Sequence, residues 1–452
     1  MPRKLVLIVI DGLTTAAFER AVEERTAPAL VYLADHGRYG RAVSTFPSLT
    51  PVCLTSIVTG GGPDVHRIPH LVWYDRDQHR LIEYGSSFAA LRAAGMTRSI
   101  LDTILWMNQR HLSPDAVTIY EALEEAELVA AAINITCYRG TTRYLPKLPG
   151  VTKAAYGPKR FFYYSLFESD RTGAPLAVRN RAAGSIDAYA AAAGRWLVTR
   201  DGFDFLAYYL SDYDFASHAY GPDAADGALA RVDAAVSTLM AAAGGPDEFL
   251  DRYAVVLCSD HGQTAVTRAA RLQDTFARLR GQVLVAASNR AGQVYRLPTC
   301  KLETAELAAL LDAEPAIEVS LRRENGDAVA RRAGEELRFA PDGDAGWRTS
   351  GDVALLSGPN ALERAWAALG NPNAGELLVS AVRGYEFADI GGGHHAGGGS
   401  HGSLAESDSI VPMLTVGVDR MPARITEIAP VVLEHFGVEP PPYARPLASA
   451  AA

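Results

Sequence analysis

Three apolar stretches of the sequence each lead into an aspartate, and aspartates offer the oxygen atoms that hydrolytic and metal-dependent chemistry uses. The stretches with their aspartates are Leu5–Ile10 with Asp11, Phe205–Leu210 with Asp214, and Tyr253–Cys258 with Asp260. One aspartate after a strand usually begins a turn or caps a helix. Three of them can converge on one crevice, because open parallel sheets bind ligands at the carboxyl ends of their strands.

Imidazoles accompany these carboxylates. His218 follows Asp214 by four residues, which places both on one face of a helix. His261 directly follows Asp260, and His401 lies in a loop rich in glycine and serine, where a surface position would also fit it. Mixed imidazole and carboxylate ligands suit zinc, with manganese or iron as alternatives. Two such ions about 4 Å apart can clamp the oxygens of an in-line phosphoryl displacement.

Thr50 stands before Pro51 at the start of a helix expected to end at Gly60. Proline suits the first helical position, where its missing N–H would have been unpaired. Thr50 would then be the N-cap, beside the positive end of the helix dipole, where a phosphate is favoured. A threonine hydroxyl needs activation to act as a nucleophile, so plain helix capping is the alternative role.

Composition excludes several functional classes. The chain has 452 residues and a formal net charge of −9, with 43 Lys+Arg against 52 Asp+Glu, which argues against a nucleic-acid polymer or an anionic membrane as partner. No stretch approaches the ~20 apolar residues of a transmembrane helix, and the first apolar run is too short for a signal peptide. Four dispersed cysteines without CxxC pairs exclude a disulfide framework. We therefore expect a cytoplasmic protein, and its oligomeric state is unknown at this stage.

Alternation of apolar strands with helical segments predicts an α/β fold with a mostly parallel central sheet and helices on both faces. One helix is expected over Ala17–His36, and residues 61–115 are expected to be irregular loops over a site. Between residues 283 and 384 the pattern becomes that of a small α+β insertion. We therefore predict a catalytic domain of residues 1–282 and 385–452 and an inserted cap-like region of residues 283–384.

Together the motifs resemble those of the alkaline phosphatase superfamily, and within it the type I phosphodiesterase/nucleotide pyrophosphatase family. They occur in that family's order and extend from residue 11 to residue 402. The motifs are Asp11-Gly12, Thr45-Phe46-Pro47-Ser48-Leu49-Thr50, Ser56-Ile57-Val58-Thr59-Gly60, Asp214-Phe215-Ala216-Ser217-His218 with Gly221-Pro222, Ser259-Asp260-His261-Gly262, and His401-Gly402.

The resemblance implies a two-zinc hydrolase of a small anionic phosphate ester. Thr50 would attack phosphorus to form a phospho-threonine, which water activated by the second metal would then release. The implied ligands are Asp11, Thr50, Asp260 and His261 for one zinc, and Asp214, His218 and His401 for the other.

One position departs from the family's pattern. Its diesterases usually carry asparagine three residues after the nucleophile, where the side chain holds a phosphoryl oxygen, and this chain has Cys53. A thiol is a weak donor, so a substrate-facing Cys53 would leave that oxygen to be stabilised from elsewhere. The choice between diesters and monoesters therefore stays open.

Alternatives within the same fold are a phosphomonoesterase, a phosphonate hydrolase or a mutase. A sulfatase is disfavoured, because Thr50 replaces the cysteine that such enzymes convert to formylglycine. A metal-stabilised binding protein without catalysis is the alternative from another class, and it would be indicated by loss of a ligand or of the nucleophile, neither of which is lost.

Overall fold

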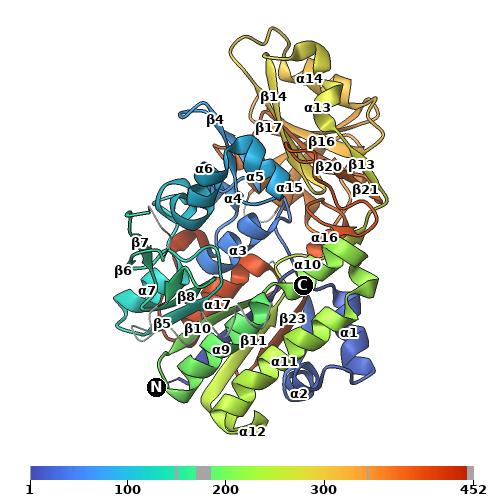
Figure 1. Ribbon diagram of the computed structural model, residues 1–452. Helices are drawn as coiled ribbons and strands as arrows, with labels where there is room; N and C mark the ends of the chain where they lie inside the picture. The colour runs from blue at the N-terminus through green and yellow to red at the C-terminus, as the bar shows by residue number, and fades with distance from the viewer. Residues whose placement is uncertain (1, 148–150, 169–184, 344–345, 445–452) are drawn as a thin grey trace.

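The computed structural model describes residues 2–147, 151–168, 185–343 and 346–444, and it is built on two sheets (Figure 1). The larger one has eight strands in the order β2-β23-β11-β1-β10-β5-β8-β9. Their bounds are β2 (Arg38–Val43), β23 (Ile410–Val416), β11 (Tyr253–Cys258), β1 (Lys4–Ile10), β10 (Phe205–Leu210), β5 (Ala130–Ile133), β8 (Arg160–Tyr163) and β9 (Phe167–Glu168).

This central sheet is mixed, so the expected mostly parallel sheet is wrong in its outer part. Strands β11, β1, β10, β5 and β8 pair in parallel, whereas β23 pairs antiparallel with both β11 and β2, and β9 pairs antiparallel with β8. The reversal at β23 has a local cause. The chain enters β23 from the loop that carries His401, at the carboxyl ends of the parallel strands, and must run back across the sheet.

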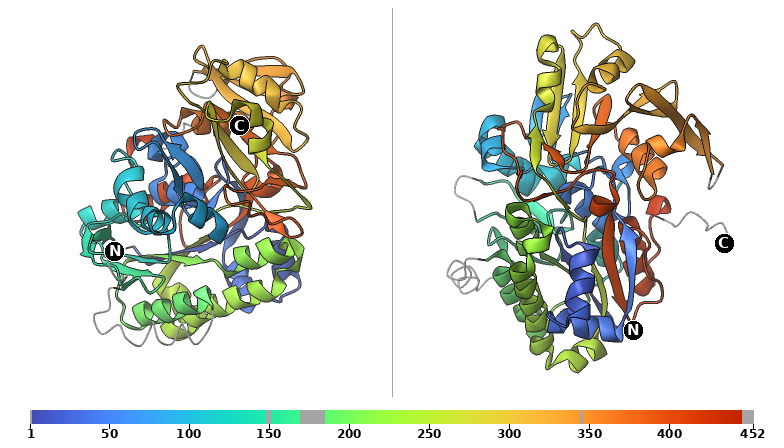
Figure 2. Two further views of the ribbon diagram at one scale, coloured as in Figure 1. Left: turned by 45° about the horizontal axis from the view of Figure 1, so that its top comes forward. Right: turned by 90° about the vertical axis from the view of Figure 1, so that its right-hand side faces the viewer.

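Helices cover both faces of the central sheet, as the buried apolar strands predicted. In β1, Leu5, Leu7 and Val9 belong to one core, while Val6, Ile8 and Ile10 belong to the other. Figure 2 shows helices α9 and α11 (green) together on one side of the sheet. The first core contains α3 (Thr50–Thr59), α7 (Ile119–Glu125) and α17 (Ile428–His435), and the second contains α1 (Thr15–Glu23), α2 (Pro28–His36), α9 (Ile186–Thr199) and α11 (Asp226–Ala243).

The second sheet is wholly antiparallel and lies at the top of Figure 1. Helices α14 (Thr304–Leu311) and α15 (Ala361–Gly370) pack on it. Its strands, in spatial order, are β14 (Val283–Ser288), β15 (Ala291–Arg296), β20 (Leu377–Ala381), β16 (Ile317–Glu324), β17 (Asp327–Arg332), β18 (Glu335–Asp342) and β19 (Gly346–Ser350). The division of the chain into a catalytic domain and a cap-like region remains a prediction.

Two local expectations were wrong. The expected helix over residues 17–36 is two helices, because Arg25 has a left-handed φ of 55° and Pro28 starts a new helix. Residues 61–115 are largely ordered, since apolar side chains such as Trp73 and Leu105 are buried in the first core. This segment contains α4 (Pro63–His66), β3 (Val72–Asp75), β4 (Arg80–Glu83), α5 (Phe88–Ala94), α6 (Met96–Leu101) and the π-helix η1 (Asp102–His111). In the described part of the chain, every helix is too short or too polar to cross a membrane.

A buried ion pair joins the second sheet to the segment that leads into β23. Arg290, in the turn between β14 and β15, donates from Nη1 to both carboxylate oxygens of Asp408, at 2.7 and 2.8 Å. Neither side chain is exposed. Asp408 also accepts hydrogen bonds from the N–H and the hydroxyl of Ser403, two residues after His401. The pair therefore fixes the second sheet against the loop that carries His401.

Replacement of Arg290 should destabilise the fold strongly. Arg290→Met leaves the Asp408 carboxylate buried without its cation, so we expect the free energy of unfolding to fall by about 3–5 kcal/mol. Urea denaturation followed by circular dichroism measures the change. Arg348→Met is the matched control, because the Arg348–Asp327 pair is exposed and such pairs contribute at most about 1 kcal/mol. Equal losses in the two variants would contradict a structural role for the buried pair.

Candidate active site

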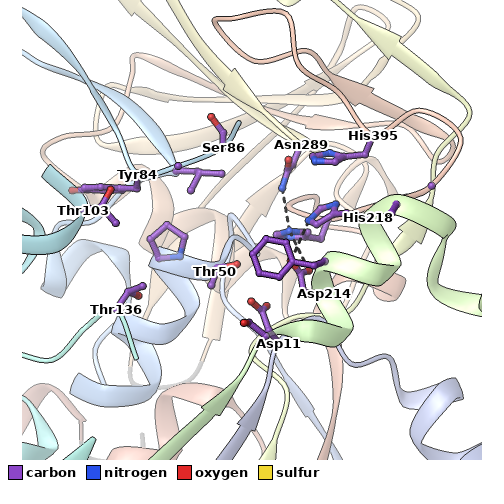
Figure 3. Close-up of a pocket in the computed structure, with 18 of the residues that line it drawn as sticks. Asp11, Thr50, Tyr84, Ser86, Thr103, Thr136, Asp214, His218, Asn289 and His395 are labelled. Atoms are coloured by element: carbon purple, nitrogen blue, oxygen red, sulfur yellow. Dashed lines mark hydrogen bonds and ion pairs between the residues drawn. The ribbon is translucent and has the colours of Figure 1, made fainter. Parts of the chain in front are cut away.

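A cavity of 680 Å³ opens at the carboxyl ends of the parallel strands (Figure 3). Asp11 enters it from the end of β1, and Asp214 and His218 enter it from α10 (Asp212–Tyr220), the helix that follows β10. Thr50 lies between these acidic residues and a wall that includes Tyr84. The convergence of strand ends expected from the sequence is therefore present.

Three oxygen atoms surround Nε2 of His261, and two of them belong to Asp11 and Thr50, which line the cavity. Thr50 Oγ1 lies 3.1 Å from this nitrogen, Asp11 Oδ1 lies 3.3 Å from it, and Asp260 Oδ2 lies 3.4 Å from it. Asp11 Oδ1 and Asp260 Oδ2 are both buried without a hydrogen-bond partner. Two orphaned carboxylate oxygens beside an imidazole nitrogen fit a bound cation and are costly without one.

A second group adjoins the first. His218 Nε2 lies 3.3 Å from Asp214 Oδ2, and His401 Nε2 lies 4.0 Å from Asp214 Oδ1. The rings of His261 and His401 stack with centroids 3.6 Å apart, which links the two groups. Asp11, Asp260 and His261 are close enough to share one ion, and so are Asp214, His261 and His401.

In all three histidines a backbone carbonyl engages Nδ1 and leaves Nε2 as the nitrogen that can ligate a metal. Nδ1 of His218 bonds the carbonyl of Gly399 at 2.8 Å, Nδ1 of His261 bonds that of Gly262 at 3.0 Å, and Nδ1 of His401 bonds that of Ser48 at 2.7 Å. A carbonyl oxygen only accepts, so each Nδ1 is the donor. In the neutral rings the lone pair is therefore on Nε2, which is the arrangement of histidines that ligate metals.

The charges of the buried side chains in the site also favour bound cations. Burial, followed by the charges of Asp214 and Asp260, raises the pKa of Asp11 well above its usual range. Burial likewise raises the pKa of Asp260. Burial would raise the pKa of Asp214 too, but the neighbouring His218, His401 and His261 outweigh it and lower that pKa. Divalent cations would neutralise this cluster, and its oxygen and imidazole donors suit zinc.

Thr50 is not the N-cap that the sequence predicted. Leu49 holds that position, and Thr50 is the first residue of α3 and makes no capping hydrogen bond. The backbone N–H groups of Val52 and Cys53 both donate to the carbonyl of Leu49. The Thr50 hydroxyl consequently faces His261 instead of its own helix, which makes it available for chemistry.

Cys53 does not line the cavity, so the expected contact with substrate is not supported. Its side chain is fully buried, and its sulfur lies 3.3 Å from Ser44 Oγ and 3.5 Å from Thr45 Oγ1. Burial raises the pKa of the thiol to about 12. Cys53 is buried because the core encloses α3 along its length and position 53 faces the segment that follows β2.

Several side chains around the site were missed by sequence reasoning. Tyr209 donates its hydroxyl to Asp11 Oδ2, and Gln263 donates to Asp214 Oδ1. His395 stacks on His218 with centroids 4.0 Å apart, and Asn289 contacts His401. Gln263 follows the Asp260 motif in sequence and could have been noticed. Nothing in the local sequence marks Asn289, because it belongs to the second sheet.

Comparisons with known proteins agree with this geometry. The family described as type I phosphodiesterase / nucleotide pyrophosphatase matches residues 5–404. A search of curated sequences finds no match. Among solved structures, phosphonoacetate hydrolase from Sinorhizobium meliloti 1021, in complex with phosphonoformate, is similar with a TM-score of 0.63 and 18% identity over 96% of each chain. Murine ectonucleotide pyrophosphatase / phosphodiesterase 5 is similar with a TM-score of 0.63 and 13% identity, over 97% of this chain and 96% of that one.

The mixed sheet with helices on both faces is the fold that these solved hydrolases share. The family match shows more: the chain belongs to the type I phosphodiesterase/nucleotide pyrophosphatase family and is a phosphoric ester hydrolase. The family is metal-dependent, and the buried Asp and His groups provide the matching donors.

The raised pKa of Asp11 leads to a prediction for the stability of the metal-free protein. Because its pKa is raised by folding, the folded state retains a proton that the unfolded state has lost, and stability falls as pH rises through that interval. Asp11→Asn removes this cost, so the chelator-treated variant should melt at a higher temperature than wild type, by more at pH 8 than at pH 5.

Added zinc should reverse the order of the two melting temperatures, because the variant has lost a ligand. Wild type should gain more thermal stability from zinc than Asp11→Asn. Differential scanning calorimetry measures both effects. Asp77→Asn, at an exposed position, is the control. A lower melting temperature for metal-free Asp11→Asn would contradict the charge argument.

Proposed function

We propose that the protein is a two-zinc hydrolase of small phosphate esters, with phosphodiesters as its main substrates and phospho-Thr50 as its intermediate. The observation that carries the proposal is the position of the Thr50 hydroxyl. It lies 3.1 Å from His261 Nε2, among the orphaned carboxylate oxygens, and is not engaged in capping its helix. A nucleophile held against a cation site is the arrangement that activates a weakly acidic hydroxyl.

The donor atoms suggest how two ions would be shared. Asp11, Thr50, Asp260 and His261 would hold one, and a separate set consisting of Asp214, His218 and His401 would hold the other. When bound, such ions lower the pKa of coordinated hydroxyl groups and neutralise charge on phosphoryl oxygens. Manganese or iron would also suit these ligands.

The chain's own residues account for the covalent steps. The Thr50 oxygen forms a bond to phosphorus while the bond from phosphorus to the leaving oxygen breaks, and that oxygen departs with the electron pair and takes up a proton. Water then attacks the same phosphorus, the bond to Thr50 breaks, and the hydroxyl is restored. Tyr209 and Gln263 hold Asp11 and Asp214 in orientation throughout, because each donates a hydrogen bond to one carboxylate oxygen.

The wall opposite the acidic cluster suits an organic group without charge. It is formed by aromatic, apolar and hydroxyl side chains, and the described residues that line the cavity include no lysine or arginine. Members of this wall are Leu71, Tyr84, Ser86, Thr103, Met107 and Thr136. The solved complex of AMP with an inactive threonine-to-alanine variant of murine ectonucleotide pyrophosphatase / phosphodiesterase 5 (TM-score 0.62, 12% identity, over 97% of this chain and 96% of that one) is consistent with such a ligand.

A phosphonate hydrolase is the second candidate, because the Sinorhizobium meliloti 1021 phosphonoacetate hydrolase shares the fold. A phosphonate that carries a carboxylate would meet mainly hydroxyl, aromatic and apolar side chains in the described wall. For that reason we place phosphodiesters first, ahead of phosphonates, phosphomonoesters and a mutase reaction.

A substrate panel tests this order. We expect zinc-loaded protein to hydrolyse bis(4-nitrophenyl) phosphate at least tenfold faster, in kcat/KM, than 4-nitrophenyl phosphate or phosphonoacetate. Release of nitrophenolate, or of inorganic phosphate, is the measurement. Faster turnover of phosphonoacetate would instead favour the phosphonate hydrolase, and faster turnover of the monoester would favour a phosphomonoesterase.

Removal of the nucleophile tests the covalent route. Thr50→Ala should lower kcat by about a thousandfold or more, because the attacking oxygen is lost. Thr50→Ser should retain part of the activity. Elemental analysis should find close to two zinc ions per chain in wild type, which separates loss of the nucleophile from loss of metal. Normal turnover by a folded, metal-loaded Thr50→Ala protein would exclude phospho-Thr50.

A further inference from the structure

Asn289 reaches the candidate active site from the second sheet. It lies in the two-residue turn between β14 and β15, where Ser288 pairs with Ala291, and it lines the cavity with only 4% of its surface exposed. In Figure 3 the Asn289 side chain lies above His218, on the same side of the cavity as Asp214. It is therefore a contribution of residues 283–384 to a site otherwise built from the central-sheet part of the chain.

The turn that carries Asn289 is fixed on both sides. The Asn289 carbonyl accepts a hydrogen bond from the N–H of Phe387 at 2.6 Å, and the N–H of Arg290 donates to the carbonyl of His401 at 2.8 Å. The Arg290 guanidinium is bound to Asp408, as described above. Asn289 consequently has little freedom to move away from His401.

The amide of Asn289 donates to Nε2 of His401, the same nitrogen that a bound cation would use. Its Nδ2 lies 3.0 Å from His401 Nε2. Since His401 Nδ1 donates to Ser48, Nε2 is the acceptor and the asparagine amide is the donor. An ion bound at Nε2 would occupy the same lone pair. The amide would then lose its acceptor, and a buried donor without a partner costs about 1–3 kcal/mol.

We propose that Asn289 is a substrate-binding residue, and that its amide donates to a phosphoryl oxygen once His401 is occupied by a metal ion. The amide lines the cavity, so an oxyanion bound there is an acceptor within its reach. This inference rests on the proposed function. It also identifies, in a distant part of the chain, a hydrogen-bond donor for the phosphoryl oxygen, which the buried Cys53 cannot supply.

The plainer account is that asparagine is present for the turn alone. Asn289 has a φ of 56°, and asparagine tolerates the left-handed region better than most residues. Asn325 offers a matched comparison within the same sheet. It too is the first residue of a two-residue turn, between β16 and β17, with a φ of 51°, but it is exposed. Glycine relieves the backbone cost at both positions and removes the amide at both.

Orthovanadate binding to the zinc-loaded protein separates the two accounts. We expect Asn289→Gly to bind vanadate about 10–100-fold more weakly than wild type, the effect of losing a hydrogen bond to a charged group. Asn289→Asp, which keeps the turn and the shape but replaces the donor with a carboxylate, should bind it still more weakly. Asn325→Gly should stay within about twofold of wild type. Competition by vanadate in the esterase assay and isothermal titration both report the constant.

Zinc content is measured on the same samples. Undiminished vanadate affinity in zinc-replete Asn289→Gly would overturn the assignment. Loss of zinc from that variant would also overturn it, because Asn289 would then act on the metal site instead of on the substrate. Failure of the proposed function is distinguishable, since wild type itself would then bind no vanadate in the presence of zinc, or the Thr50→Ala variant would turn over substrate normally.

Discussion

The site depends on the burial of three carboxylates, Asp11, Asp214 and Asp260, around His261. Each follows a buried strand of the central sheet, so the apolar packing that forms the sheet also forces the charges together. Burial raises the pKa of Asp11 and of Asp260, so the ionised forms of these two carboxyl groups oppose folding while no cation is bound. Such a cluster is stable only when cations or protons offset its charge.

The surroundings of the cluster are arranged to orient donor atoms. Backbone carbonyls fix the tautomers of His218, His261 and His401, and the hydroxyl of Tyr209 takes one oxygen of Asp11 while leaving the other free. Because these partners come mostly from the backbone and from buried strands, the geometry is set before any ligand arrives. Preorganised donors of this kind lower the cost of stabilising charge that develops during a reaction.

The second sheet is part of the same design. Its β14–β15 turn contacts the loop of His401 through Arg290 and Asn289, so the second sheet contributes directly to the site. The ion pair of Arg290 with Asp408 supplies rigidity, and Asn289 supplies a polar group inside the cavity. The β14–β15 hairpin therefore contributes both to the stability of the fold and to the lining of the site.

The sequence by itself determined the α/β class, the buried strands and the metal-ligand candidates, because strand periodicity and short motifs such as Asp260-His261 are local signals. It could not determine the reversed direction of β23, since strand direction depends on how a distant loop returns to the sheet. Capping by Thr50 was predicted wrongly, because the direction of a side chain at the start of α3 depends on what encloses that helix. The burial of Cys53 in the core has the same cause. Only the tertiary structure decided that Asn289 joins His401, more than a hundred residues along the chain, and no local pattern records such a contact.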